Sequence, residues 1–137
     1  MTYSIVDLFA GAGGLSLGFL ETGEFAVKAF VENNKNARKT YKRNHDSVKE
    51  YTNVIGLDYR TLIQDCGEID VVVGGPPCQG FSNANRQKNH AISQNNMLVK
   101  QYLRAILELQ PKAFVMENVS MLRSEVHRFY MEKDDEE

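Results

Sequence analysis

The feature that most constrains this chain is the stretch from Ile69 to Ser82, which reads IDVVVGGPPCQGFS. Its first part, Ile69–Val73, is a short and mostly β-branched apolar run, which is the pattern of a fully buried strand. Gly74 and Gly75 end that strand. The two prolines that follow fix φ at successive positions and leave the backbone little freedom. The stretch therefore predicts a buried strand followed by a rigid turn that presents Cys78.

Cys78 has two interpretations. An isolated cysteine is most often a small buried hydrophobe. A thiol held on a rigid turn at the carboxyl end of a strand suits a nucleophile, provided that a neighbouring group favours the thiolate. The Gly-Gly-Pro-Pro before Cys78 and the Gln-Gly-Phe-Ser after it favour the nucleophile. The other cysteine, Cys66, has no metal-like spacing from Cys78, and we expect no structural disulfide in a cytoplasmic protein.

Length and hydropathy predict one domain that is independent of a membrane. The 137 residues suffice for one domain with a proper core. No apolar run approaches the length of a membrane span, and the N-terminus lacks the charged and apolar regions of a signal peptide. We therefore expect a cytoplasmic protein.

The charge distribution gives little sign of a nucleic-acid surface. The formal net charge is −2, and the segment 132–137, with five acids and one lysine, contributes −4, which leaves +2 for residues 1–131. So weak a charge predicts that most of any phosphate-binding surface lies elsewhere. We expect residues 1–131 to form the domain and residues 132–137 to be a disordered acidic tail.

Strand and helix patterns alternate along the chain. A long polar loop at 83–96 separates two of them and suits a lid or a binding loop. The alternation predicts an α/β fold, a Rossmann-like, mainly parallel sheet with helices on both faces. Strands are expected at 4–9, 25–31, 54–57, 69–73 and 113–116, and helices at 15–20, 34–45, 60–65, 97–110 and 121–131. The basic side chains of the second helix are expected to form a solvated face: Lys35, Arg38, Lys39, Lys42 and Arg43.

A glycine-rich turn, Ala10–Gly14, joins the first strand to the first helix. In this layout the backbone approaches a cofactor closely and the N–H groups of the helix face it, although many such turns are only turns. Ser16 stands where the dinucleotide fingerprint needs glycine, and no Gly-Lys-Ser/Thr follows for a phosphate-binding P-loop. Glu32, at the end of the second strand, lies where an acid commonly binds a ribose. An acid that only starts a helix is an equally good interpretation of Glu32.

The polar features named above follow the carboxyl ends of predicted strands. In an open α/β sheet, that edge is where ligands bind. The features are the glycine turn, Glu32, Asp58, Cys78 and Glu117. Their placement predicts a single site along this edge.

Three motifs carry a resemblance to a known family. Pro76–Ser82 (PPCQGFS) resembles the nucleophile motif of the DNA cytosine-5 methyltransferases, and Asp7–Gly14 (DLFAGAGG) is similar to their cofactor loop. Glu117–Val119 (ENV), with Pro111-Lys112 before it, resembles a third motif about forty residues after the first. The first and third motifs are specific together, and the resemblance extends from Asp7 to about Val119.

The resemblance implies S-adenosylmethionine as the cofactor, S-adenosylhomocysteine as its product, and no metal. Glu32 matches the family's ribose acid, Asp58 matches the acid beside the adenine, and Asn96–Leu98 resembles the start of a further cofactor-contacting motif. The cofactor-binding residues expected on this basis are Phe9, Ala10, Gly11, Gly13, Gly14, Leu15, Glu32, Asn33, Asp58, Tyr59, Pro77 and Leu98.

The same resemblance implies covalent catalysis on a cytosine flipped out of double-stranded DNA, as in restriction–modification systems. Cys78 would add to carbon 6 and make carbon 5 nucleophilic, because a pyrimidine carbon 5 is unreactive while the ring stays conjugated. Glu117 would hold or protonate ring nitrogen 3, and Asn118 completes the expected catalytic set. The polar loop after Ser82 would close over the base.

The sequence after Val119 departs from the family. It carries no Arg-containing active-site motif, no target-recognition domain and no C-terminal motif that completes the cofactor pocket. We therefore expect the N-terminal portion or one subunit of a larger enzyme, with a second polypeptide or the missing C-terminal half as partner, or self-association. A non-catalytic module that binds S-adenosylmethionine or a partner, and a fragment of a tRNA cytosine-5 methyltransferase, remain as alternatives.

Overall fold

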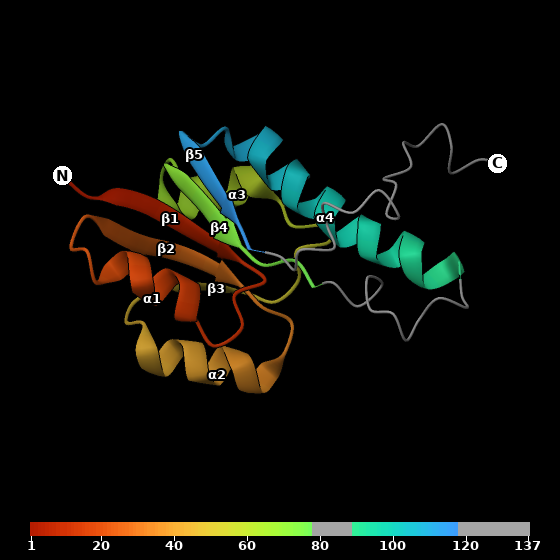
Figure 1. Cartoon of the computed structure of the whole chain (residues 1–137). Coiled ribbons are helices and arrows are strands. Elements are labelled where there is room, and N and C mark those ends of the chain that lie inside the picture. The colour runs from red at the N-terminus through yellow and green to blue at the C-terminus, as the bar shows by residue number, and fades with distance from the viewer. Residues whose placement is uncertain (78–88, 118–137) are drawn as a thin grey trace.

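Five parallel strands form one sheet with helices on both faces (Figure 1). The computed structural model describes residues 1–77 and 89–117, without the side chains of 89–96. The strand order is β3-β2-β1-β4-β5, and each neighbouring pair is parallel. The elements are β1 (Tyr3–Leu8), α1 (Gly14–Leu20), β2 (Phe25–Val31), α2 (Lys35–Asn44), β3 (Lys49–Tyr51), α3 (Tyr59–Cys66), β4 (Val71–Gly74), α4 (Asn89–Leu109) and β5 (Ala113–Met116).

The sheet separates two hydrophobic cores, as expected for strands that are apolar on both faces. One core joins β1, β2 and β4 to α3 and α4, and includes the fully buried Val6, Val72, Leu62 and Tyr102. The other core joins the opposite face of the same strands to α1 and α2. Its members include Ile5, Phe30, Tyr41, Val73, Leu15 and Phe19. The predicted α/β fold with helices on both faces is confirmed.

Local interactions explain where the helices begin. Asn34 caps α2, since its side chain accepts hydrogen bonds from the backbone N–H of Asn36 (2.9 Å) and Ala37 (3.0 Å). Gly13 precedes α1 with φ 90°, a conformation that favours glycine. A Cβ at Gly13 would collide with the His45 ring and lie 2.8 Å from the Tyr41 ring. The glycine turn therefore packs directly against α2.

Tyr102 attaches α4 to the sheet. Its hydroxyl donates to the carbonyl oxygens of Val115 (2.8 Å) on β5 and Val72 (3.2 Å) on β4. A Cβ at Gly74 would meet the carbonyl oxygen of Leu8 on β1 and lie 3.1 Å from the Tyr102 ring. Glycine at the end of β4 thus permits close contact between β1, β4 and α4.

Two expectations about the elements are wrong. The predicted strand 54–57 is a turn, and the third strand is Lys49–Tyr51, which pairs with Ala29–Val31 on β2. Gly56 in that turn has φ 74°, which a strand does not permit. Residues 89–96, expected in a polar loop, belong to α4, which is longer than the apolar periodicity indicated. Only the spacing from residue 97 onward showed an apolar face, so the polar first turns of this helix gave no signal.

Residues 83–88 of the expected loop, the helix expected at 121–131 and the tail at 132–137 lie outside the described residues. Within 1–77 and 89–117, no helix is both long and apolar enough to span a membrane.

Candidate functional site

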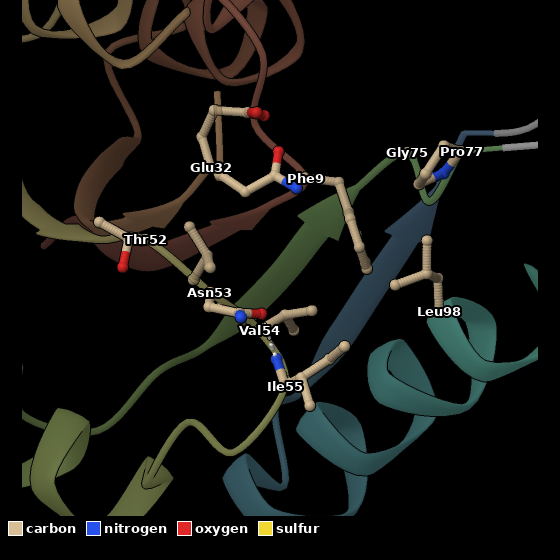
Figure 2. A pocket seen from close by; sticks show the side chains of 11 residues that line it. Phe9, Glu32, Thr52, Asn53, Val54, Ile55, Gly75, Pro77 and Leu98 are labelled. Carbon is tan, nitrogen blue, oxygen red and sulfur yellow. Dashed lines mark hydrogen bonds between the residues drawn. The ribbon is translucent and has the colours of Figure 1, made fainter. Parts of the chain in front are cut away.

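A cavity of about 450 Å³ opens at the carboxyl edge of the sheet (Figure 2). Figure 2 shows Glu32 at one end, Val54 and Ile55 at the other, and Leu98 of α4 facing them below Gly75 and Pro77. The Glu32 carboxylate therefore lies at one end, while much of the remaining wall is aliphatic, with the Asn53 side chain beside Val54. The lining residues are Phe9, Val31, Glu32, Asn33, Thr52, Asn53, Val54, Ile55, Gly75, Pro77 and Leu98.

A second cavity of about 520 Å³ adjoins the first, and Phe9 and Gly75 line both. It is lined by Asp7, Phe9, Ala10, Gly14, Leu15, Gly75 and Glu117. A Cβ on Gly75 would lie 3.3 Å from the backbone oxygen of Glu117, so glycine lets the segments after β4 and β5 approach closely. The two cavities together form a continuous site with carboxylates in both parts.

Phe9 lines both cavities and has φ 54°, a left-handed conformation that is uncommon outside glycine. The N–H of the next residue, Ala10, donates to the Val31 carbonyl oxygen (3.1 Å), which ties the end of β1 to the end of β2. Strained backbone of this kind is concentrated at binding sites, where the surrounding structure holds it in place. The conformation directs the chain from β1 into the glycine turn.

Glu32 binds the glycine turn directly. Its Oε2 accepts the N–H of Gly11 (2.8 Å), and its Oε1 accepts the N–H of Asn34 (2.9 Å), the capping residue of α2. Glu32 therefore supports the start of α2, as expected for an acid that starts a helix, and it also lines the first cavity, while its contact with a ribose stays a prediction. A carboxylate has about four acceptor positions, so two remain for ligand hydroxyls.

Asp7 lies beneath the glycine turn in a buried polar network. Only 1% of its surface is exposed, and its Oδ2 accepts the Tyr41 hydroxyl (3.3 Å). The Ser16 hydroxyl lies 3.0 Å from the Tyr41 hydroxyl and 3.1 Å from Nε2 of His45. Burial raises the pKa of Asp7 to about 7, despite the opposing hydrogen bonds from Ser16 and Tyr41, and the charge of Glu32 adds to the rise.

Most of the predicted cofactor residues lie together at the two cavities. Gly11 does not line them and instead donates its N–H to Glu32, and Gly13 packs against Tyr41. Cys78 and Asn118 lie outside the described residues, although Pro77 and Glu117, their chain neighbours, line the first and second cavity respectively. The predicted residues at the cavities are Phe9, Ala10, Gly14, Leu15, Glu32, Asn33, Pro77, Leu98 and Glu117.

Asp58 and Tyr59 are not at these cavities. Asp58 caps α3, where it accepts the N–H of Arg60 (3.0 Å) and the hydroxyl of Thr61 (3.1 Å), and these bonds hold its pKa below the ordinary value. Tyr59 is fully buried, and the guanidinium of Arg104 lies over its aromatic ring. Both residues line a separate hollow on the surface. The expected place of Asp58 at the sheet edge depended on a strand at 54–57, and with a turn there Asp58 caps α3 instead.

The sequence reasoning missed Asp7 and the wall formed by Thr52, Asn53, Val54 and Ile55. Asp7 begins the DLFAGAGG motif that resembles the family's cofactor loop, and this motif is the signal that could have added it to the expected site residues. The wall follows β3, a three-residue strand with no apolar run. Its Asn53 side chain, which accepts the N–H of Ile55 (2.9 Å), is a typical turn signal that would have excluded a strand.

Other chemistry has little support among the described residues. Cys66 is half-buried at the end of α3, away from the cavities, and burial raises the pKa of its thiol. In the part of the chain that the structure describes, no group of three or more His, Cys, Asp or Glu residues is placed to hold a metal ion.

Comparison with known proteins gives consistent matches. Residues 3–133 match the family model described as C-5 cytosine-specific DNA methylase. Type II methyltransferase M.AgeI of Thalassovita gelatinovora is 40% identical over 124 residues, covering 87% of this chain and 28% of that protein. Type II methyltransferase M.XorII of Xanthomonas oryzae is 40% identical over 134 residues, covering 93% and 31%.

A solved structure matches over nearly the same range. It is the crystal structure of a prophage-encoded protein from E. coli described as a DNA modification methyltransferase. Its TM-score is 0.77 at 34% identity, and the match covers 91% of this chain and 34% of that one. The chain thus spans about a third of the length of each of these three relatives.

Proposed function

The chain belongs to the C-5 cytosine-specific DNA methylase family, and from this premise we propose that it binds S-adenosylmethionine in the two adjoining cavities. We propose further that, as the N-terminal portion or subunit of a larger enzyme, it takes part in methylating carbon 5 of cytosine in double-stranded DNA. The observation that carries the proposal is the pair of adjoining cavities at the carboxyl edge: Glu32 lines the first, the glycine turn lines the second, and Glu32 accepts the N–H of Gly11 in that turn.

The lining of the cavities suits this cofactor. The aliphatic side chains of Val54, Ile55 and Leu98 offer apolar surface to a flat adenine ring. The free acceptor positions of Glu32 suit the two ribose hydroxyls. The carboxylate of Glu117 in the second cavity would attract the positive sulfonium and ammonium groups. The residues present therefore fit S-adenosylmethionine, which supplies an electrophilic methyl group when bound.

The chemistry of the base is assigned to Cys78 and to Glu117, which lines the second cavity. The thiolate of Cys78 would form a bond to carbon 6 while the carbon 5–carbon 6 double bond opens, which makes carbon 5 nucleophilic. Glu117 would meet the base at nitrogen 3 and limit the negative charge there. After methylation, loss of the proton from carbon 5 would restore the double bond and release Cys78.

Binding of S-adenosylhomocysteine to the purified chain tests the proposal, with calorimetry as the measurement. Glu32→Ala should raise the Kd about tenfold or more, because a ligand hydrogen bond to a charged group and the support of Gly11 are lost together. Glu24→Ala is the matched control, since Glu24 is exposed and precedes β2, at the opposite end of the strand that Glu32 follows. Equal affinities of the wild type and Glu32→Ala would contradict the assignment.

A further inference from the structure

The wall of the first cavity opposite Glu32 consists of a short turn, residues 53–57, that belongs to no helix or strand. Two local hydrogen bonds stabilise its backbone, one from a side chain and one within the backbone itself. Asn53 Oδ1 accepts the N–H of Ile55 (2.9 Å), and the N–H of Leu57 lies 3.4 Å from the Val54 carbonyl oxygen. These local bonds alone are few for a segment that must present Val54 and Ile55 in a fixed position.

Arg104 on α4 supplies the connection between this turn and the rest of the fold. Its Nη2 donates to the carbonyl oxygen of Val54 (2.9 Å), and its Nη1 donates to the carbonyl oxygen of Leu57 (3.0 Å). Hydrogen bonds from a charged donor are about twice as strong as neutral ones. The guanidinium thus binds the 53–57 turn near both of its ends, at Val54 and at Leu57.

The guanidinium is itself held in place. Its Nε donates to Oε1 of Gln101 (3.0 Å), and its carbon lies 4.9 Å from the centre of the Tyr59 ring. Glu108 pairs with Nη1 at 3.2 Å, at the more exposed end of the group. A planar fork of donors suits two separate carbonyl oxygens in a way that the single ammonium of lysine does not.

We propose that Arg104 is a positioning residue for the cofactor cavity: it holds the 53–57 turn so that Val54 and Ile55 form the wall that faces Leu98. The same helix then serves the cavity twice, directly through Leu98 and indirectly through Arg104. This inference rests on the proposed binding of S-adenosylmethionine. Arg104 does not line the cavity, so its effect on the ligand is transmitted through the turn.

The test uses the whole chain and two measurements, the Kd of S-adenosylhomocysteine and the exchange rates of backbone amides. Arg104→Ala should raise the Kd about tenfold and should increase the exchange of the Ile55 and Leu57 amides by a similar factor. Amides in the centre of β4 should keep their protection. Arg104→Lys should give intermediate values, because lysine keeps the charge but cannot reach both carbonyl oxygens.

Two control variants separate positioning from general stability. Glu108→Gln removes the exposed ion-pair partner and leaves both carbonyl bonds in place, so its Kd should stay within about twofold of wild type. Leu109→Ala removes a buried side chain at the C-terminal end of α4, well beyond Leu98, and should lower the Tm without changing the Kd.

The outcomes distinguish this inference from the proposed function. If wild type binds S-adenosylhomocysteine and Arg104→Ala binds equally well, the positioning role is overturned and the proposed function stands. If Leu109→Ala weakens binding as much as Arg104→Ala, the effect is one of stability and the positioning role is again overturned. If wild type shows no binding at all, the proposed function fails, and the inference about the cofactor fails with it.

Discussion

Replacing Asp7 with Asn should change how the stability of this fold depends on pH. Asp7 has 1% of its surface exposed, and burial is the largest cause of its raised pKa. The groups that face it are Ser16 and Tyr41, which form hydrogen bonds to it, the charge of Glu32, and Tyr102 and Glu117 near the same cavity. The hydrogen bonds to the ionised carboxylate therefore do not offset the cost of removing its charge from water in the folded chain.

The sign and size of the effect follow from linkage. The pKa of Asp7 rises from 3.8 to about 7 on folding, so the folded state keeps a proton that the unfolded state releases between these values. The stabilising effect of that proton is complete below pH 3.8 and is lost as the pH rises through 7. At about 1.4 kcal/mol per pH unit, the full loss is roughly 4 kcal/mol. Asparagine keeps the shape and a carbonyl acceptor for Tyr41 but cannot ionise.

Urea denaturation of the wild type and Asp7→Asn at several pH values between 4.5 and 8 measures the effect. The unfolding free energy of Asp7→Asn relative to wild type should rise by about 3 kcal/mol across this range. Contributions of the other ionisable groups are common to both proteins and largely cancel when the two unfolding free energies are subtracted. A difference that stays constant with pH would refute the reasoning, as would an NMR titration that places the Asp7 carboxyl midpoint near 4.

Two further predictions concern single side chains. Incubation of the larger enzyme with DNA that contains 5-fluorocytosine should trap a covalent adduct at Cys78. An adduct at Cys66, or one that persists in Cys78→Ala, would contradict the assigned nucleophile. Tyr59→Phe should leave stability unchanged or raise it by up to about 1 kcal/mol, because its buried hydroxyl has no hydrogen-bond partner among the described residues. Tyr102→Phe, which loses bonds to Val72 and Val115, is the control and should cost about 1 kcal/mol in the same urea assay.

The sequence was informative wherever periodicity and turn chemistry act locally. Apolar β-branched runs located β1, β2, β4 and β5 to within two residues, because strands buried on both faces have little freedom in composition. β3 was misplaced because it is a three-residue edge strand whose pattern is mixed, while the apolar residues Val54 and Ile55 lie in the following turn. These two apolar side chains line the cavity and imitate the signal of a strand, so Asp58 was expected at the sheet edge although it caps α3.

Residues that act on backbone atoms are the ones that sequence patterns do not reveal. Arg38 was expected on a solvated face, yet its Nη1 donates to the carbonyl oxygens of Glu32 (2.9 Å) and Asn33 (2.7 Å). Arg104 does the same for Val54 and Leu57 on the other side of the cavity. Segments that follow parallel strands leave carbonyl oxygens that no neighbouring strand uses, and buried carbonyls need a donor. A long cationic side chain from a nearby helix can supply that donor, and its position in the sequence follows no apolar periodicity. The geometry of the proposed ligand site therefore depends on arginines that look like ordinary surface charges in the sequence.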